Sequence, residues 1–352
     1  MTRRRWLLWG AIGVACATAL SLTALLVHHG DLLCFVNLSP RFSLGDPRAP
    51  GGGYDGQFAY FIAREPMSAV PQLDVPAYRW QRVLYPMLAR LVSFGHAEWV
   101  PFALVAVNVI AVGIGTGALA RLMKVEQAPA WLPIMFFAWF GTGQALLYDL
   151  NEITALAFSL VALWLFFRGQ VIEAGLVFGL GALAKDLVFL FAVPCAVHLF
   201  VTRRSRQSLG LSILAIGPYL LWMLALRIAL GRWSFDAQAT QFTVIPFSGI
   251  QGSGPATAFV IALLILPGFV CLFLAFKHWR DVYSLSVMSS FAFVTFLPSY
   301  SYSADAVFRL STPLVLAGAL LLARFRRRTW LILFASLWSA TGVLSVLVAT
   351  GR

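Results

Sequence analysis

Acidic residues and cysteines are scarce in this chain of 352 residues. Aspartate and glutamate together number 14, whereas hydrophobic residues make up 60% of the sequence. The cysteines form no Cys-x-x-Cys pair, so the sequence indicates neither a disulfide framework nor a zinc site, and we interpret them as small packing residues. There are four of them: Cys16, Cys34, Cys195 and Cys271.

Several motifs that carry the chemistry of soluble enzymes are also missing. The sequence has no P-loop and no Gly-x-Gly-x-x-Gly beside a strand, which argues against a cytosolic nucleotide-sugar domain. It has neither a serine elbow nor a His-Glu-x-x-His helix. We expect no cofactor. Whether the acidic residues hold a divalent cation or only pair with bases stays open.

What is present is apolar sequence broken by short basic loops. The mean hydropathy is +0.82 and only 11% of the residues are charged, which is typical of a polytopic membrane protein. The net charge of +12 would suggest a nucleic-acid partner for a soluble protein. In this chain the bases cluster between apolar runs, so membrane orientation explains them and we expect no nucleic acid.

We predict one all-α transmembrane domain over residues 1–352, with about eleven transmembrane helices. The first apolar run is too long for the core of a signal peptide and lacks a clear cleavage site, so we interpret it as a retained helix. The predicted helices are Trp6–Val27, Trp99–Met123, Trp131–Tyr148, Ile153–Phe167, Val171–Ala184, Leu187–Val201, Leu209–Leu230, Thr257–Phe276, Val282–Pro298, Leu310–Ala323 and Trp330–Ala349.

The basic loops fall on one side of the membrane if these helices alternate in direction, and that side is the cytoplasmic one. The amino terminus is then inside and the carboxyl terminus outside. Most acids map to the outer side, which indicates an active site facing away from the cytoplasm. These acids are Asp31, Asp46, Asp55, Glu65, Asp74, Glu98, Asp149, Glu152, Asp186, Asp236 and Asp305, whereas Glu126, Glu173 and Asp281 map to the inner side.

Three consecutive predicted helices, between residues 153 and 201, have only about 15 residues each. At ~1.5 Å per residue they cover about 22 Å of a hydrocarbon core that is about 30 Å thick. Their outer turns should therefore lie below the membrane surface, where ionisable groups face a hydrated cavity or one another. We expect Asp149, Glu152 and Lys185 to meet there, in a cluster that is either functional or structural.

The first external loop, residues 28–98, is the only long segment that is neither apolar nor basic. In it Asp55 follows three glycines, and Tyr54–Arg64 is predicted as a short amphipathic helix lying in the membrane interface. A second such helix is predicted from Tyr78 to Arg90, with Arg79 and Arg82 on one face. Outer-loop arginines also contact lipid headgroups, but two arginines near an aspartate favour a site for phosphate and hydroxyl groups.

Four stretches resemble bacterial multispan proteins of the GT-C glycosyltransferase superfamily. They are Tyr54–Ala63, Tyr78–Pro86, Tyr148–Glu152 and Phe308–Pro313. The first two are also similar to the Trp-Asp…Tyr…Ile-Ala…Pro pattern of the glycosylphosphatidylinositol mannosyltransferases.

The chain departs from these patterns at two places. Tyr54 stands where the eukaryotic relatives have tryptophan. Lys185 and Asp186 stand where Arg-Glu is common, which keeps the order of charges but loses bidentate geometry.

The resemblance implies a GT-C-like enzyme of the bacterial inner membrane, with its active site on the periplasmic side. Its donor would be a polyprenyl-phosphate-linked sugar entering from the bilayer, and its acceptor a glycan, a lipid or a protein. Transfer would be inverting, with Asp55 as general base and basic side chains stabilising the phosphate leaving group. The substrate-binding candidates are Tyr54, Gln57, Arg79, Gln81, Arg82, Tyr85, Asp149, Glu152, Lys185, Asp186 and Arg309.

Two other classes of membrane protein remain as alternatives. A secondary transporter or lipid flippase places its site near the middle of the membrane and commonly shows internal repeats, and this sequence has no convincing repeat. An O-antigen-type polymerase or ligase typically carries its large loop late in the chain, whereas the longest loop here comes first.

Overall fold

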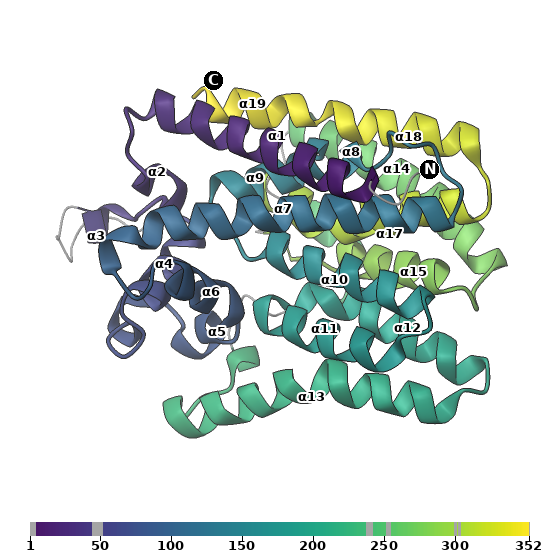
Figure 1. The fold of residues 1–352 in the computed structure, drawn as a ribbon, viewed down its shortest axis with the longest axis horizontal. Helices are drawn as coiled ribbons and strands as arrows, with labels where there is room; N and C mark the ends of the chain where they lie inside the picture. Colours follow the sequence, from purple (N-terminus) through teal and green to yellow (C-terminus); the bar gives the residue numbers. More distant parts are fainter. Residues whose placement is uncertain are drawn as a thin grey trace.

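The structure is a computed structural model that describes residues 5–43, 52–236, 242–250, 255–298, 301 and 304–351. Within these residues every regular element is a helix, and no strand occurs. Most helices run side by side along the long axis of the molecule, and the helices of the first loop gather at one end (Figure 1). The carboxyl terminus lies at that same end, and the amino terminus lies toward the opposite end (Figure 1).

Among the described residues, four helical segments are long and apolar enough to cross a membrane, which agrees with an all-α membrane protein. They are α1 (Arg5–Val27), η2 (Ala97–Trp99) continued by α7 (Val100–Val125), α13 (Ser205–Leu230), and α18 (Arg328–Ala340) continued by α19 (Gly342–Ala349). Shorter apolar helices are α10 (Glu152–Phe167), α11 (Val171–Ala184), η3 (Asp186–Val188) with α12 (Phe189–Val201), α14 (Pro255–Lys277, of which Ile261–Lys277 is fully described), α15 (Val282–Thr295) and α17 (Thr312–Arg324). The three consecutive short helices predicted from the sequence are confirmed as α10, α11 and α12.

The predicted helix Trp131–Tyr148 is wrong as a single element, because the chain breaks at Trp139. Residues on either side form α8 (Ile134–Ala138) and α9 (Phe140–Leu147), and Trp139 itself is extended, with ψ 129°. Its indole Nε1 donates to the carbonyl of Phe308 at 3.1 Å and to Thr312 Oγ1 at 3.0 Å. At the break the backbone N–H of Phe140 donates to Thr341 Oγ1 at 3.2 Å, so a side chain distant in sequence replaces a bond of the helical ladder.

The first loop folds into short helices that pack against the protein. They are α2 (Leu33–Val36), α3 (Pro40–Ser43), α4 (Gly56–Arg64), η1 (Val70–Gln72), α5 (Pro76–Trp80) and α6 (Leu84–Val92). The single helix predicted from Tyr78 to Arg90 is wrong, because the chain turns at residues 81–83.

The expectation that the aromatic side chains of α4 face lipid headgroups is also wrong. Residues Gly56–Ala63 are all buried, and their aromatic side chains join an apolar cluster with α6 and α7. Protein side chains, and not lipid headgroups, therefore cover Phe58, Phe61 and Ile62.

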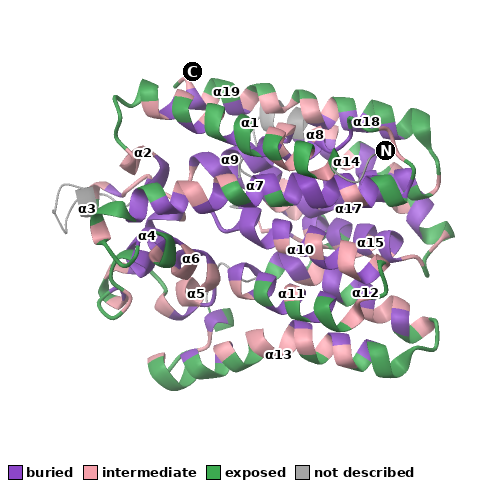
Figure 2. Ribbon diagram, in the orientation of Figure 1, coloured by how far each residue is buried: buried purple, intermediate pink, exposed green. Residues whose placement is uncertain are grey.

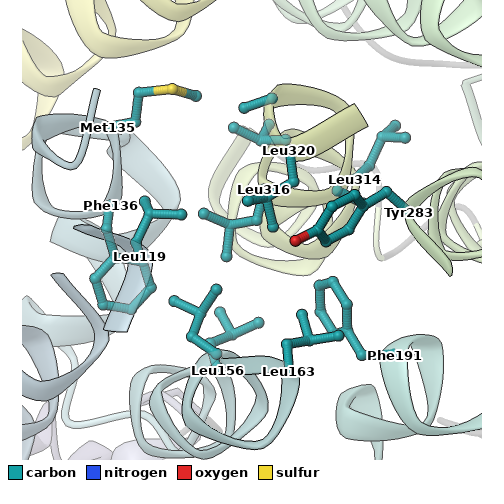
Figure 3. Close-up of a cluster of buried hydrophobic side chains, with 14 of the residues drawn as sticks. Leu119, Met135, Phe136, Leu156, Leu163, Phe191, Tyr283, Leu314, Leu316 and Leu320 are labelled. Atoms are coloured by element: carbon teal, nitrogen blue, oxygen red, sulfur yellow. The ribbon is translucent and has the colours of Figure 1, made fainter. Parts of the chain in front are cut away.

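The main apolar core lies among α7 to α10, α12, α15 and α17. Figure 3 shows part of it, where leucines of α7, α10 and α17 meet Phe136, Phe191 and Tyr283. The outer helices, by contrast, expose large apolar side chains along α1 and α13 (Figure 2), including Leu26, Leu221 and Ile228. Exposed apolar surface of this extent is uncommon in soluble monomers and fits contact with lipid.

A second polar cluster lies at the end of α7 far from the first loop. Arg324 Nη1 lies 3.3 Å from the carboxylate of Glu126, and Arg324 Nε lies 3.4 Å from that of Asp281. These three residues join the ends of α7, α15 and α17. The apolar core separates them from the polar groups near the first loop.

Candidate functional site

A cavity of about 290 Å³ lies where the first loop meets η3, α15 and α16 (Ala304–Leu310). One wall is polar and charged: Asp55, Tyr78, Arg79, Arg82, Lys185, Asp186 and Arg309. The other wall is apolar and includes Leu187, Phe242, Phe293, Leu297 and Pro298. Its size is near the lower end of ordinary ligand pockets, about 300–1,000 Å³, and its two walls suit a ligand that is charged on one side and apolar on the other.

Asp55 is held between two arginines at the amino-terminal end of α4. Arg79 Nη1 donates to Asp55 Oδ1 at 2.9 Å, and Arg309 Nη2 donates to Asp55 Oδ2 at 3.3 Å. Burial would raise the pKa of Asp55, but the two arginines outweigh it and hold the pKa well below its usual range. The side chain is still 27% exposed, so a ligand in the cavity can reach this carboxylate.

The ion pairs extend from Asp55 in both directions. Arg79 also donates to both oxygens of Asp74, each at 2.7 Å. Arg309 Nη1 and Lys185 Nζ each lie 2.5 Å from the same oxygen of Glu152. Three acids and three bases therefore alternate along one chain of contacts, which leaves these six charges balanced.

Arg82 adds a positive charge that forms no ion pair with these six residues. Its side chain is buried, and its Nη2 donates to the Tyr78 hydroxyl at 2.5 Å. Its Nε has no hydrogen-bond partner, and within the described part of the chain no carboxylate forms an ion pair with it. Arg82 thus lies in the cavity lining without an ion pair, although Asp55 and Asp186 line the same cavity, and a cation so placed can bind an anion.

Aromatic rings pack against the guanidinium groups of two of these arginines. The Arg79 guanidinium lies 3.9 Å from the centroid of the Phe58 ring, and that of Arg309 lies 5.3 Å from the centroid of Tyr54. The Tyr54 ring in turn packs on Tyr148, with 4.7 Å between centroids. These cation–π contacts fix the direction in which each guanidinium points.

Asp149 does not join the cluster in which it was expected. Its backbone is left-handed, with φ 49°, so it does not share a helical turn with Glu152. Its Oδ1 lies 3.5 Å from the hydroxyl of Tyr85, which also accepts from Asn108 Nδ2 at 2.8 Å, and its Oδ2 is buried without a partner. The expected meeting with Lys185 is therefore wrong for Asp149, and the structure brings only Glu152 and Lys185 together.

Five other residues predicted from the sequence do not line the cavity: Tyr54 and Glu152, which contact Arg309, and Gln57, Gln81 and Tyr85. Gln57 Oε1 accepts from the backbone N–H of Ser39 at 3.1 Å, which ties α4 to the start of α3. Gln81 Oε1 accepts from the Tyr219 hydroxyl at 3.4 Å, which ties the turn after α5 to α13. Tyr85 is fully buried behind the site. In the structure these three side chains hold the loop in place.

Sequence reasoning missed Tyr78, Asp74 and the apolar wall. The spacing of Tyr78 and Arg82, four residues apart, matches one face of a helix and so offered a signal, although α5 ends at Trp80 and Arg82 lies in the turn that follows it. Phe242 and Phe293 gave no such signal, since only the fold brings them to the first loop.

Among the described residues, no group of three or more histidine, cysteine or acidic side chains is arranged to hold a metal ion. Comparison with protein-family models, with curated proteins and with solved structures found no match.

Proposed function

We propose that this chain is a membrane glycosyltransferase of the GT-C type. It moves a sugar from a polyprenyl-phosphate-linked donor to an acceptor on the outer, periplasmic side of a bacterial inner membrane. The observation that carries this proposal is a cavity whose lining combines the reachable carboxylate of Asp55, four basic side chains and apolar side chains, with Asp186 as its second acid.

The phosphate of the donor binds to the cationic wall. Arg82 has no counter-ion in the described structure, and the guanidinium groups of Arg79 and Arg309 already point into the same space. Planar guanidinium groups bind phosphate through paired hydrogen bonds. The first isoprene units of the lipid lie against the apolar wall at Phe293 and Leu297.

Asp55 acts as general base on the acceptor. The acceptor hydroxyl oxygen forms a bond to the anomeric carbon of the sugar while the bond from that carbon to the phosphate oxygen breaks. The hydroxyl proton passes to the Asp55 carboxylate, and the electron pair leaves with the polyprenyl phosphate. Arg79, Arg82 and Arg309 stabilise the negative charge that develops on this leaving group.

Donor binding and base strength are coupled in this site. Both Asp55 oxygens bond to Arg79 and Arg309, so the free carboxylate is a weak base. A phosphate on the same two arginines offsets their charge and raises the pKa of Asp55 toward the range that suits a general base. The carboxylate becomes an effective base when the donor is in place.

The distribution of polar groups supports an enzyme over a transporter. The two charged clusters lie at opposite ends of the helices, and the core between them is mainly apolar, with the leucines and phenylalanines of Figure 3 and some uncharged polar side chains. A transporter often places charged or substrate-binding groups at a broken helix near the middle. The break at Trp139 lies in the apolar core, and the Trp139 indole is bonded to Phe308 and Thr312.

Donor binding by the purified protein tests this proposal. We expect polyprenyl phosphate to compete with a polyprenyl-phosphate sugar, and Arg82→Gln to weaken donor binding roughly tenfold or more, because one charge-assisted hydrogen bond is lost. Arg90→Gln is the matched control, since Arg90 lies in the same loop and donates to backbone carbonyls outside the cavity. Equal donor affinity in the parent and in Arg82→Gln would contradict the proposal.

A further inference from the structure

A second cavity, of about 400 Å³, lies between α1, α7 and α10 on the half of α7 far from the first loop. Glycines let α1 and α7 pack closely, since a Cβ atom on Gly10 would lie 3.2 Å from the carbonyl oxygen of Gly113, and the cavity is a groove beside this contact. Leu7, Ile110 and Ile114 line it and are about half exposed, at 52%, 52% and 50%. The cavity therefore opens onto the apolar outside of the helix bundle.

The polar end of this cavity is a single arginine held between two indole rings. The Arg121 guanidinium lies 3.8 Å from the ring centroid of Trp6 and 4.1 Å from that of Trp164. The exposed Arg168 lies on Trp164 as well, at 5.1 Å. Neither arginine has a carboxylate within ion-pair distance among the residues described. The charge at this end of the cavity is positive and not neutralised by the protein.

We propose that this cavity binds one anionic phospholipid, with an acyl chain along the groove lined by α1, α7 and α10 and the phosphate on Arg121. An apolar space open to the bilayer accepts an acyl chain, and a basic group between helices binds an acidic headgroup. The tryptophans mark the depth of the membrane interface, where a lipid phosphate lies. This site is independent of the proposed glycosyl transfer, because it shares no residue with the cavity around Asp55.

Lipid retention measured by native mass spectrometry tests the phosphate contact. The purified protein is exchanged into micelles containing phosphatidylglycerol and phosphatidylcholine with the same acyl chains. We expect one retained phosphatidylglycerol, with a preference over phosphatidylcholine that Arg121→Gln lowers about tenfold. The matched control is Arg206→Gln, which removes an exposed charge at the start of α13 that lines no described cavity and should keep the preference.

A second variant tests the acyl-chain contact without changing any charge. Ala11 lines the cavity and is exposed, so Ala11→Phe fills the space and should lower phosphatidylglycerol retention while Arg121 is intact. Unchanged retention in either Arg121→Gln or Ala11→Phe would overturn the proposal. An equal loss in Arg206→Gln would also overturn it, because the lipid would then respond only to surface charge.

Discussion

Glu152 accepts hydrogen bonds from two cations at once. We therefore expect its substitution to lower the stability of the protein more than substitution of either cation. Its carboxylate is 2% exposed and lies against both Lys185 and Arg309. Glu152→Gln leaves two cations without their shared acid, and breaking such a buried pair destabilises a protein by about 3–5 kcal/mol. Lys185→Met leaves Glu152 paired with Arg309, so the loss should be smaller. Thermal unfolding in detergent measures both, and the reverse order would contradict the arrangement.

The pH dependence of transfer reports on Asp55 in two states. In the free protein burial opposes the charged form, but Arg309 and Arg79 prevail and lower the pKa of Asp55. Because its pKa is lower in the folded than in the unfolded protein, the Asp55 carboxylate stabilises the fold fully at pH values above its unfolded pKa. This stabilisation is lost as the pH falls toward the folded pKa. The acid limb of kcat/KM, which reports the free enzyme, should therefore lie below the usual carboxyl range near ~4.

The acid limb of kcat reports the donor complex, in which phosphate offsets the arginines. It should lie at higher pH than the limb of kcat/KM. Steady-state rates across the acid range measure both limbs. If the acid limbs of kcat and kcat/KM lie at the same pH, donor binding does not change the pKa of Asp55, and the proposed coupling is wrong.

At the scale of the elements, α4 is positioned by one close backbone approach. A Cβ atom on Gly56 would lie 2.2 Å from the carbonyl oxygen of Tyr148. Gly56→Ala must therefore push α4 and Asp55 away from Arg309, and a misplacement of about 1 Å lowers rates by roughly 10²-fold. Gly210→Ala in α13 is the matched control, because nothing lies within 4 Å of its Cβ position. Equal transfer by the two variants would contradict this role for Gly56.

Hydropathy predicted much of the order of the helices, because long apolar runs separated by basic loops almost always form membrane-spanning helices. The positions at which helices are interrupted could not be predicted from the sequence. Trp139 leaves the helix to bond with Phe308 and Thr312, about 170 residues away in sequence, and no local pattern encodes such a partner. Asp149 and Glu152 have helical spacing, yet a left-handed Asp149 separates them.

In the candidate site, too, contacts within one loop could be predicted, whereas contacts between distant parts of the chain could not. Asp55, Arg79 and Arg82 could be predicted to lie together because they share one short loop. The contact between Asp55 and Arg309 spans most of the chain, and the residues themselves gave only a resemblance to suggest it. The apolar wall at Phe242 and Phe293 depends entirely on tertiary structure.

At the scale of the whole molecule, the direction of the helices in the membrane is a prediction from the basic loops. Single cysteines at positions 98 and 206, in a chain whose native cysteines have been replaced, test it, since Glu98 and Arg206 are both exposed. We expect a membrane-impermeant thiol reagent added outside intact cells to label position 98 and not position 206. Labelling of position 206 alone would reverse the orientation and place Asp55 in the cytoplasm.

The most direct test of the account is sugar transfer by purified Asp55→Asn. Asparagine keeps the size of the side chain and removes the base, while Arg79 keeps Asp74 and Arg309 keeps Glu152, so the protein should remain folded. Transfer should fall roughly 10²–10⁴-fold with donor binding retained. Glu98→Gln, an exposed acid of the same loop outside the cavity, should transfer at the parental rate. Transfer by folded Asp55→Asn at the parental rate would contradict the account.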